Sequence, residues 1–220
     1  MQPRKQMQKQ KNKFELVQMS PQNTNSVVIF DGDKCVVFDP WGHVDDWEKY
    51  FATCGARPVA IYATHGHPDH ISAAAALATR FNIDWYMSHA DLDQIEWGNG
   101  LLQYFKLPQL SPNDKKPINL SAGVCIILRD TKMQIIELPG HTRGGVGYYF
   151  PDYGVLVVGD TLFQESYGRT DLPGGDEQSL FQSIAKLYNM YLPDTTAVVH
   201  GHGMHTTIGL LKQKNAFFRN

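Results

Sequence analysis

Short apolar runs separated by Gly, Pro, Asn and Asp residues dominate the first half of the chain. Some runs are continuous and rich in Val and Ile, which is typical of buried strands, whereas others have the apolar spacing of amphipathic helices. The Asp31-Gly32 pair between two continuous runs predicts a hairpin turn. The pattern predicts an edge strand over residues 14–19, further strands over 26–30, 35–38, 58–63 and 85–88, and helices over 44–54, 71–81 and 90–97.

The second half of the chain echoes this order of elements. The same patterns predict strands over residues 124–128, 133–138, 146–150, 155–158 and 196–199, a helix over 179–188, and one short helix at the C-terminal end. Residues 98–121 are rich in Pro, Gly and Asn, so we expect a long surface loop or lid there. Strands followed by helices, twice over, predict an α/β fold in which two sheets pack back to back and the helices lie outside.

The composition is that of a globular protein, with 42% hydrophobic and 19% charged residues among 220, enough chain to bury a core as one domain. Five basic residues and no acidic ones fall within the first 13 positions. We therefore expect a disordered basic tail at residues 1–13 and a single domain at 14–220. The rest of the chain has 15 basic against 22 acidic residues, a net charge of −7, which argues against a nucleic-acid partner.

The cysteines and the apolar runs indicate where the protein resides. Cys35, Cys54 and Cys125 have no short spacing, which is typical of reduced thiols rather than of a disulfide framework or a thiolate metal site. No apolar run reaches the length of a membrane span, about 18 residues, and the N-terminus lacks the apolar core of a secretory signal. We therefore expect a cytoplasmic protein without a membrane partner; the sequence leaves the oligomeric state open.

The densest chemistry in the chain is the motif Thr-His-Gly-His-Pro-Asp-His, which follows the strand predicted over residues 58–63. His65 and His67 are two positions apart on extended chain, so both rings leave the same side and can bind one ion. Asp69 and His70 follow at the start of the next predicted helix, and their side chains can hold a further group beside that ion. Imidazole and carboxylate together favour zinc, iron or manganese over calcium or magnesium.

Three more polar positions follow predicted strands in the same way, and each is bracketed by Gly or Pro: His141, Asp160 and His202. Together with the motif they supply five imidazoles and two carboxylates. One tetrahedral zinc takes four ligands, so this set fits two ions that share a bridging carboxylate.

The motif, with the later Pro-Gly-His-Thr, Gly-Asp-Thr-Leu-Phe and Gly-His-Gly segments, resembles the metallo-β-lactamase superfamily between residues 25 and 209. This resemblance implies a four-layer αββα sandwich of two mixed β-sheets with outer helices. The segments Gly-Arg-Thr-Asp and Gly-Gly-Asp that follow Asp160 resemble the glyoxalase II branch, which contains the hydroxyacylglutathione hydrolases and their single-domain bacterial relatives. Persulfide dioxygenases lie in the same branch.

The resemblance assigns a role to each candidate residue. It implies a first metal held by His65, His67 and His141, a second held by Asp69, His70 and His202, and a bridging Asp160. It also implies that Asp69 has an additional catalytic role, in which it orients the attacking hydroxide. Arg169 would bind a carboxylate of the substrate. A structural ion pair is the alternative for Arg169. His200 stands where relatives usually have Pro, so it competes with His202, which the register of the motif favours.

We therefore expect a hydrolase of small-molecule glutathione thioesters such as S-lactoylglutathione, in which a hydroxide bridging two divalent ions attacks the carbonyl. Zinc is the expected metal, with iron or manganese as alternatives. The competing functions are an iron-dependent persulfide dioxygenase, a hydrolase of another small ester or lactone, and a metal-holding scaffold without activity. Only 18 residues follow His202, which predicts a more open substrate pocket than in glyoxalase II itself.

Overall fold

The computed structural model describes residues 13–19, 23–107, 109–110 and 114–219. The predicted basic tail lies outside these residues except for Lys13, and the single domain predicted from residue 14 stays a prediction. In one sheet the strands lie in the order β1 (Lys13–Met19), β2 (Thr24–Asp31), β3 (Lys34–Phe38), β4 (Arg57–Tyr62), β5 (Asp84–Met87) and β6 (Ile118–Asn119). In the other the order is β12 (Thr206–Thr207), β11 (Ala197–His200), β10 (Val155–Gly159), β9 (Val146–Phe150), β8 (Thr131–Glu137) and β7 (Gly123–Ile127).

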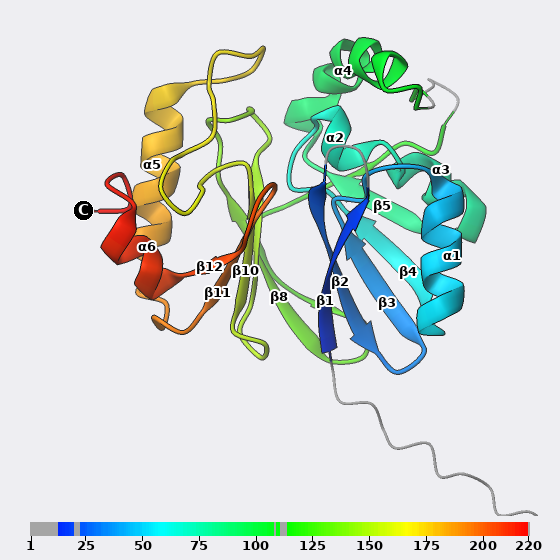
Figure 1. The fold of residues 1–220 in the computed structure, drawn as a ribbon, viewed down its shortest axis with the longest axis horizontal. Coiled ribbons are helices and arrows are strands. Elements are labelled where there is room, and N and C mark those ends of the chain that lie inside the picture. The colour runs from blue at the N-terminus through cyan, green and yellow to red at the C-terminus, as the bar shows by residue number, and fades with distance from the viewer. Residues whose placement is uncertain (1–12, 20–22, 108, 111–113, 220) are drawn as a thin grey trace, which may run out of the picture.

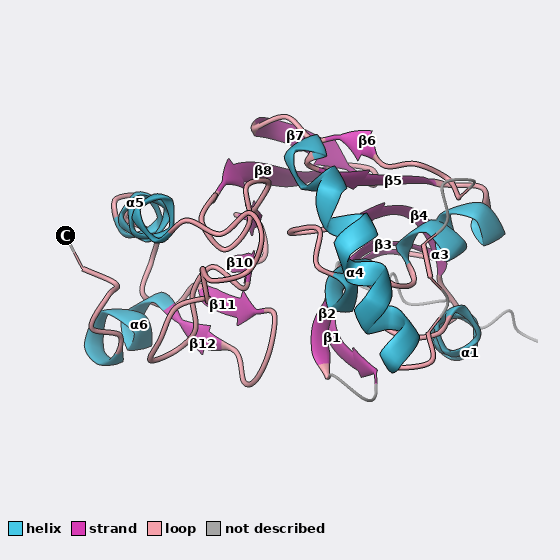
Figure 2. Ribbon diagram, turned by 90° about the horizontal axis from the view of Figure 1, so that it is seen from above, coloured by secondary structure: helices cyan, strands magenta, loops and turns pink. Residues whose placement is uncertain are grey.

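The two sheets face each other across an apolar core and carry helices on their outer sides. Phe38 of β3 and Tyr148 of β9 meet between the sheets, with ring centroids 4.9 Å apart. The outer face of the first sheet packs against α1 (Val44–Cys54) and α3 (Ala74–Phe81), and that of the second against α5 (Glu177–Tyr188) and α6 (Ile208–Lys214) (Figures 1 and 2). Both sheets contain parallel and antiparallel pairs. The predicted αββα sandwich of two mixed sheets is confirmed.

The helices after β4 differ from the prediction in two places. The helix predicted over residues 71–81 is two helices, because α2 (Pro68–Ile71) ends before Ser72 and α3 starts at Ala74. The short helix predicted over 90–97 is longer: a 3-10 turn, His89–Asp91, leads into α4 (Leu92–Tyr104). Residues 98–104 of the predicted loop are therefore helical. None of the described helices is long and apolar enough to cross a membrane.

The reason for the longer helix lies in its packing. Gly98 lies so close to α2 that a Cβ there would be 3.0 Å from Pro68 Cδ, and Leu102 is fully buried on the same face. Gly98 and Gly100 are weak helix formers, which hid the helical period in the sequence, but contact with α2 and burial of Leu102 stabilise the helix. Tertiary packing outweighs local propensity here.

Strand direction brings the carboxyl ends of distant strands to one end of the sandwich. Strands β3 and β4 are parallel, and β8, β10 and β11 share one direction because β9 runs against both β8 and β10 while β10 and β11 are parallel. The two sheets join at this end, where Val146 N donates a 2.8 Å hydrogen bond to Thr64 O. The loops that carry the candidate residues therefore meet.

Candidate metal centre

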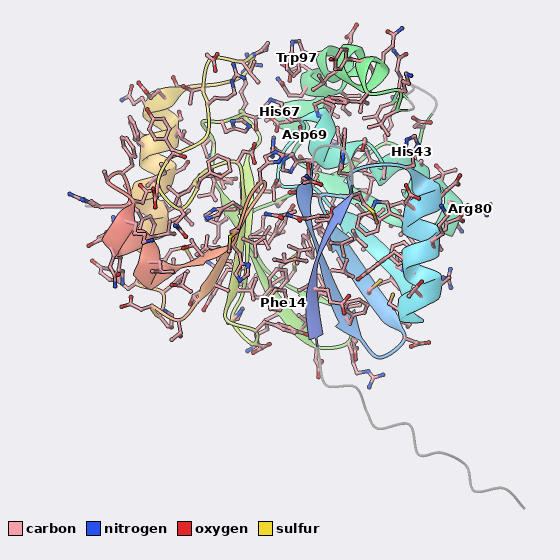
Figure 3. The ribbon with its side chains drawn as sticks, in the orientation of Figure 1. Phe14, His43, His67, Asp69, Arg80 and Trp97 are labelled. Carbon is pink, nitrogen blue, oxygen red and sulfur yellow. The ribbon has the colours of Figure 1, made fainter. Side chains whose placement is uncertain are left out.

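The loop after β4 carries His65 and His67, and the short helix α2 that follows it carries Asp69 and His70. His67 lies at the N-cap of α2 and Pro68 occupies its first turn, a position that suits the fixed φ of proline. His65, His67 and His70 are all buried, and the rings of His65 and His67 lie 4.8 Å apart, as their spacing on extended chain predicts. Figure 3 shows His67 and Asp69 at the end of the sandwich, below Trp97 of α4.

His141, Asp160 and His202, which follow β8, β10 and β11, lie at the same place. The donor atoms fall into three groups, each within 4.8 Å: His65, His67 and His141; His65, His70 and Asp160; and Asp69, His70 and His202. All seven predicted ligands belong to these groups. The oxygens of Asp160 lie 3.6 Å from His70 Nε2, 3.7 Å from His141 Nε2 and 3.6 Å from His202 Nε2. The Asp160 carboxylate is therefore within reach of both ends of the cluster.

Several donor atoms in this cluster are buried without a hydrogen-bond partner among the described residues. They are Nε2 of His65, Nε2 of His70 and Oδ1 of Asp160, three residues that form one of these donor groups. An unpaired buried polar atom costs about 1–3 kcal/mol, so a set of them facing one point requires a partner. Imidazole nitrogens and carboxylate oxygens are the donors that zinc, iron and manganese bind, and the residues present therefore fit a metal centre.

Asp39, at the end of β3, orients two of the histidines. Its carboxylate accepts hydrogen bonds from His70 Nδ1 at 2.9 Å, from Thr64 Oγ1 at 2.7 Å and from Thr64 N at 2.6 Å. Thr64 Oγ1 also lies 3.0 Å from Nδ1 of His65. His70 donates its Nδ1 proton in the hydrogen bond to Asp39, so the Nε2 atom of His70 faces the cluster, as in many carboxylate–histidine–metal triads.

Asp39 is absent from the residues predicted from the sequence. The available signal was its place directly after an apolar strand, the same place that the histidine motif occupies after β4. Asp39 is almost fully buried and has a left-handed φ of 51°, a conformation that Asp tolerates better than most residues. A single acidic residue at a strand end is too common to be singled out without knowledge of which strand lies next to it.

The electrostatics divide the cluster into two kinds of histidine. Burial lowers the pKa of His67 to about 3, and the neighbouring His141 adds to this shift. Burial acts in the same direction on His70, but Asp39, Asp69 and Asp160 outweigh it and raise the pKa of His70 to about 10. Burial alone would raise the pKa of Asp69, but His70 and His202 lower it. A cation that binds beside His70 would therefore have to displace a proton.

His141 is held by the segment that contains Arg169. Nδ1 of His141 donates to the Arg169 carbonyl at 2.7 Å, so its Nε2 faces Nδ1 of His67 at 2.9 Å. The guanidinium of Arg169 is exposed and forms two 2.7 Å hydrogen bonds with Asp171. The backbone of Arg169 thus contacts the cluster through His141, and its side chain forms the ion pair named as the alternative to substrate binding.

The structure separates His200 from His202. Nε2 of His202 lies 3.0 Å from Asp69 Oδ2, whereas His200 belongs to none of the three donor groups and its ring lies 5.7 Å from that of Phe163. Gly201 between them allows the cluster to close, because a Cβ there would be 2.0 Å from Asp160 Oδ1 and 2.6 Å from His70 Cε1.

Comparison with known proteins agrees with this geometry. The family model of the metallo-beta-lactamase superfamily matches residues 19–202. The chain therefore belongs to the metallo-β-lactamase superfamily, whose fold it shares. Among its relatives is the hydroxyacylglutathione hydrolase GloC of Haemophilus influenzae, which is 31% identical over 210 residues, 94% of this chain and 98% of that protein. This relationship is consistent with the glyoxalase II-like branch.

Two solved structures are similar over almost their whole length. The B3 metallo-beta-lactamase BLEG-1 has a TM-score of 0.81 and 32% identity, covering 94% of this chain and 100% of that one. TTHA1623 in a di-iron-bound form also has a TM-score of 0.81 and 32% identity, covering 92% of this chain and 99% of that one. The chain is thus similar both to a protein described as a B3 metallo-beta-lactamase and to one described in a di-iron-bound form.

Proposed function

We propose that this chain is a thioester hydrolase that uses two divalent metal ions and cleaves small glutathione thioesters such as S-lactoylglutathione. The observation that carries the proposal is the meeting of seven donor residues in overlapping groups around Asp160. The relationship to GloC supports the choice of substrate. Zinc is the proposed metal because the donor set suits it, and iron and manganese fit the same donors.

Each of the seven donor residues has a proposed place in the centre. His65, His67 and His141 would hold one ion, Asp69, His70 and His202 the other, and Asp160 would contact both. When bound, two such cations lower the pKa of a water molecule between them and neutralise negative charge that develops on a substrate oxygen.

The side chains of the chain itself orient the reacting groups. The Asp69 carboxylate accepts a hydrogen bond from the attacking water and so directs its lone pair at the thioester carbonyl carbon. The water oxygen bonds to that carbon, the C–S bond breaks, and the sulfur leaves with the bonding electron pair. The attacking water loses one proton in this step and the leaving sulfur takes one up, so the products are a carboxylic acid and glutathione.

The space beside His202 suits the part of the substrate that does not react. An open groove of about 700 Å³ borders this residue, and it is lined by Leu16, Gln18, Asn23, Asn25, His202, Gly203, Met204 and His205. The exposed amide side chains of Gln18 and Asn23 in this groove can hydrogen-bond a peptide-like substrate. On the opposite side, the exposed guanidinium of Arg169 would bind a substrate carboxylate, in competition with Asp171.

Two assays on metal-loaded protein test this function. We expect zinc-loaded protein to release thiol from S-lactoylglutathione without consuming oxygen, and Asp69→Asn protein to lose most of this activity. Oxygen uptake with glutathione persulfide in iron-loaded protein, without thioester cleavage, would identify the dioxygenase instead. Faster turnover of a lactone, another ester or a β-lactam than of any thioester would also contradict the proposed substrate class.

A further inference from the structure

Asp91 lies where two of the donor loops approach each other. Its side chain is fully buried and accepts hydrogen bonds from Gly66 N at 2.9 Å, Thr142 Oγ1 at 2.7 Å and Gly144 N at 2.6 Å. Gly66 lies between His65 and His67, and Thr142 follows His141 directly. One carboxylate therefore joins the loop after β4 to the loop after β8.

The surroundings of Asp91 are built for this contact. A Cβ at Gly66 would be 2.8 Å from Asp91 Cβ, and a Cβ at Gly144 would be 2.7 Å from Asp91 Cγ, so both loops approach the carboxylate as closely as only glycine permits. Asp91 also occupies the N-cap of α4, yet its side chain makes no capping hydrogen bond there. Asp is a favoured N-cap, but this carboxylate bonds to the two loops instead.

We propose that Asp91 is a positioning residue that sets the distance between His67 and His141 and so shapes the His65–His67–His141 group. The proposal rests on the metal centre proposed here. All three hydrogen bonds that its carboxylate accepts from described residues go to the two loops of this group. Asp69, His70 and His202 belong to the other end of the cluster, so loss of Asp91 should affect one ion and spare the other.

The sheets do not depend on Asp91 for their contact. Val146 N donates to Thr64 O at 2.8 Å, and Tyr148 Oη donates to Ala63 O at 2.6 Å. These bonds join the same ends of the two sheets without the carboxylate. We therefore expect Asp91→Asn protein to fold, with one backbone N–H now facing an amide NH₂ and the two loops free to separate.

The test is a titration of metal-free protein with zinc in competition with a chromophoric chelator. Native protein should bind two equivalents. In Asp91→Asn protein one equivalent should bind about 10–100-fold more weakly, the usual effect of removing a group that orients a metal ligand, while the other stays within about twofold of native. Asp93→Asn is the matched control, because Asp93 lies two residues further on and pairs with Arg143 in solvent; it should bind as the native chain does.

Several results would overturn the proposal. Asp91→Asn protein that is folded by circular dichroism and binds both equivalents like native shows that Asp91 does not position the ligands. Equal weakening of both equivalents shows a general structural role. If Asp91→Asn fails to fold, Thr142→Val, which removes only one donor, decides by the same criteria. A native chain that binds no zinc overturns this proposal and the metal centre together, whereas failure of the thioester assay alone leaves it standing.

Discussion

At the scale of single residues, acidic side chains hold the histidines and loops of the candidate centre in place. Asp39 fixes the Nδ1 side of His70 and, through Thr64, that of His65. Such outer residues decide which ring nitrogen faces the cation. The histidines and Asp160 were predictable because each follows a strand within a recognisable motif, whereas Asp39 and Asp91 are single acidic residues whose partners lie 25 to 53 positions away along the chain.

Replacement of Asp39 tests its orienting role. Asp39→Asn should weaken zinc binding about 10–100-fold, because His70 Nδ1 would lose its anionic acceptor. Chelator competition measures the affinity. Asp33→Asn, in the exposed turn before β3, is the control and should bind zinc like native protein. Equal zinc affinities in the Asp39→Asn variant and the control would show that the hydrogen bond between Asp39 and His70 has no influence on metal binding.

Gly201 offers a steric test of the same centre. Gly201→Ala would bring a Cβ within 2.0 Å of Asp160 Oδ1, so the loop with His202 must move and at least one bound ion should be lost. Gly100→Ala is the control, since it meets no heavy atom within 4 Å and should raise helix stability slightly. Metal content measured by elemental analysis distinguishes them, and two ions per chain in Gly201→Ala protein would contradict the geometry.

At the scale of elements, the apolar pattern predicts most strands and the helices α1 and α5, but not the length of α4. Strands such as β3 and β10 are continuous apolar runs that end at turns, so local sequence is sufficient to find them. The second half of α4 contains two glycines and is stabilised by its contact with Pro68 and by burial of Leu102. Contacts of this kind are not visible in a local pattern.

The packing of α4 can be tested with two neighbouring leucines. Leu102→Ala should lower the free energy of unfolding by about 2–5 kcal/mol, as for other buried leucines. Leu101→Ala, where the side chain is 39% exposed, should cost about 0.5 kcal/mol or slightly more. Chemical denaturation measures both. Equal costs would mean that residues 98–104 do not form the packed helix described here.

At the scale of the whole molecule, the candidate centre lies on the seam between two halves. The first sheet supplies the histidine motif, and the second supplies His141, Asp160 and His202 from the ends of β8, β10 and β11. The sequence predicts the layers and the convergence of these ends, because strands followed by helices recur in both halves and each candidate residue follows a predicted strand. It does not predict the contacts across the seam, which form only when the two sheets are packed together.

A centre on the seam should link metal binding to stability. Zinc in excess over the dissociation constant by 100-fold stabilises the native state by about 2.7 kcal/mol for each site, provided that the unfolded chain does not bind it. We therefore expect the melting temperature to fall on chelation and to recover when zinc returns. Calorimetric scans with and without chelator measure this, and an unchanged melting temperature would argue against ions that bridge the halves.

The most direct test of the central claim is the number of ions that each chain holds after reconstitution with zinc and removal of the excess, determined by elemental analysis. We expect two zinc ions for native protein and one for His202→Ala. His43→Ala should also hold two, because the exposed ring of His43 lies apart from the cluster (Figure 3). A native chain without zinc, or a His202→Ala chain that still holds two ions, would contradict the central claim.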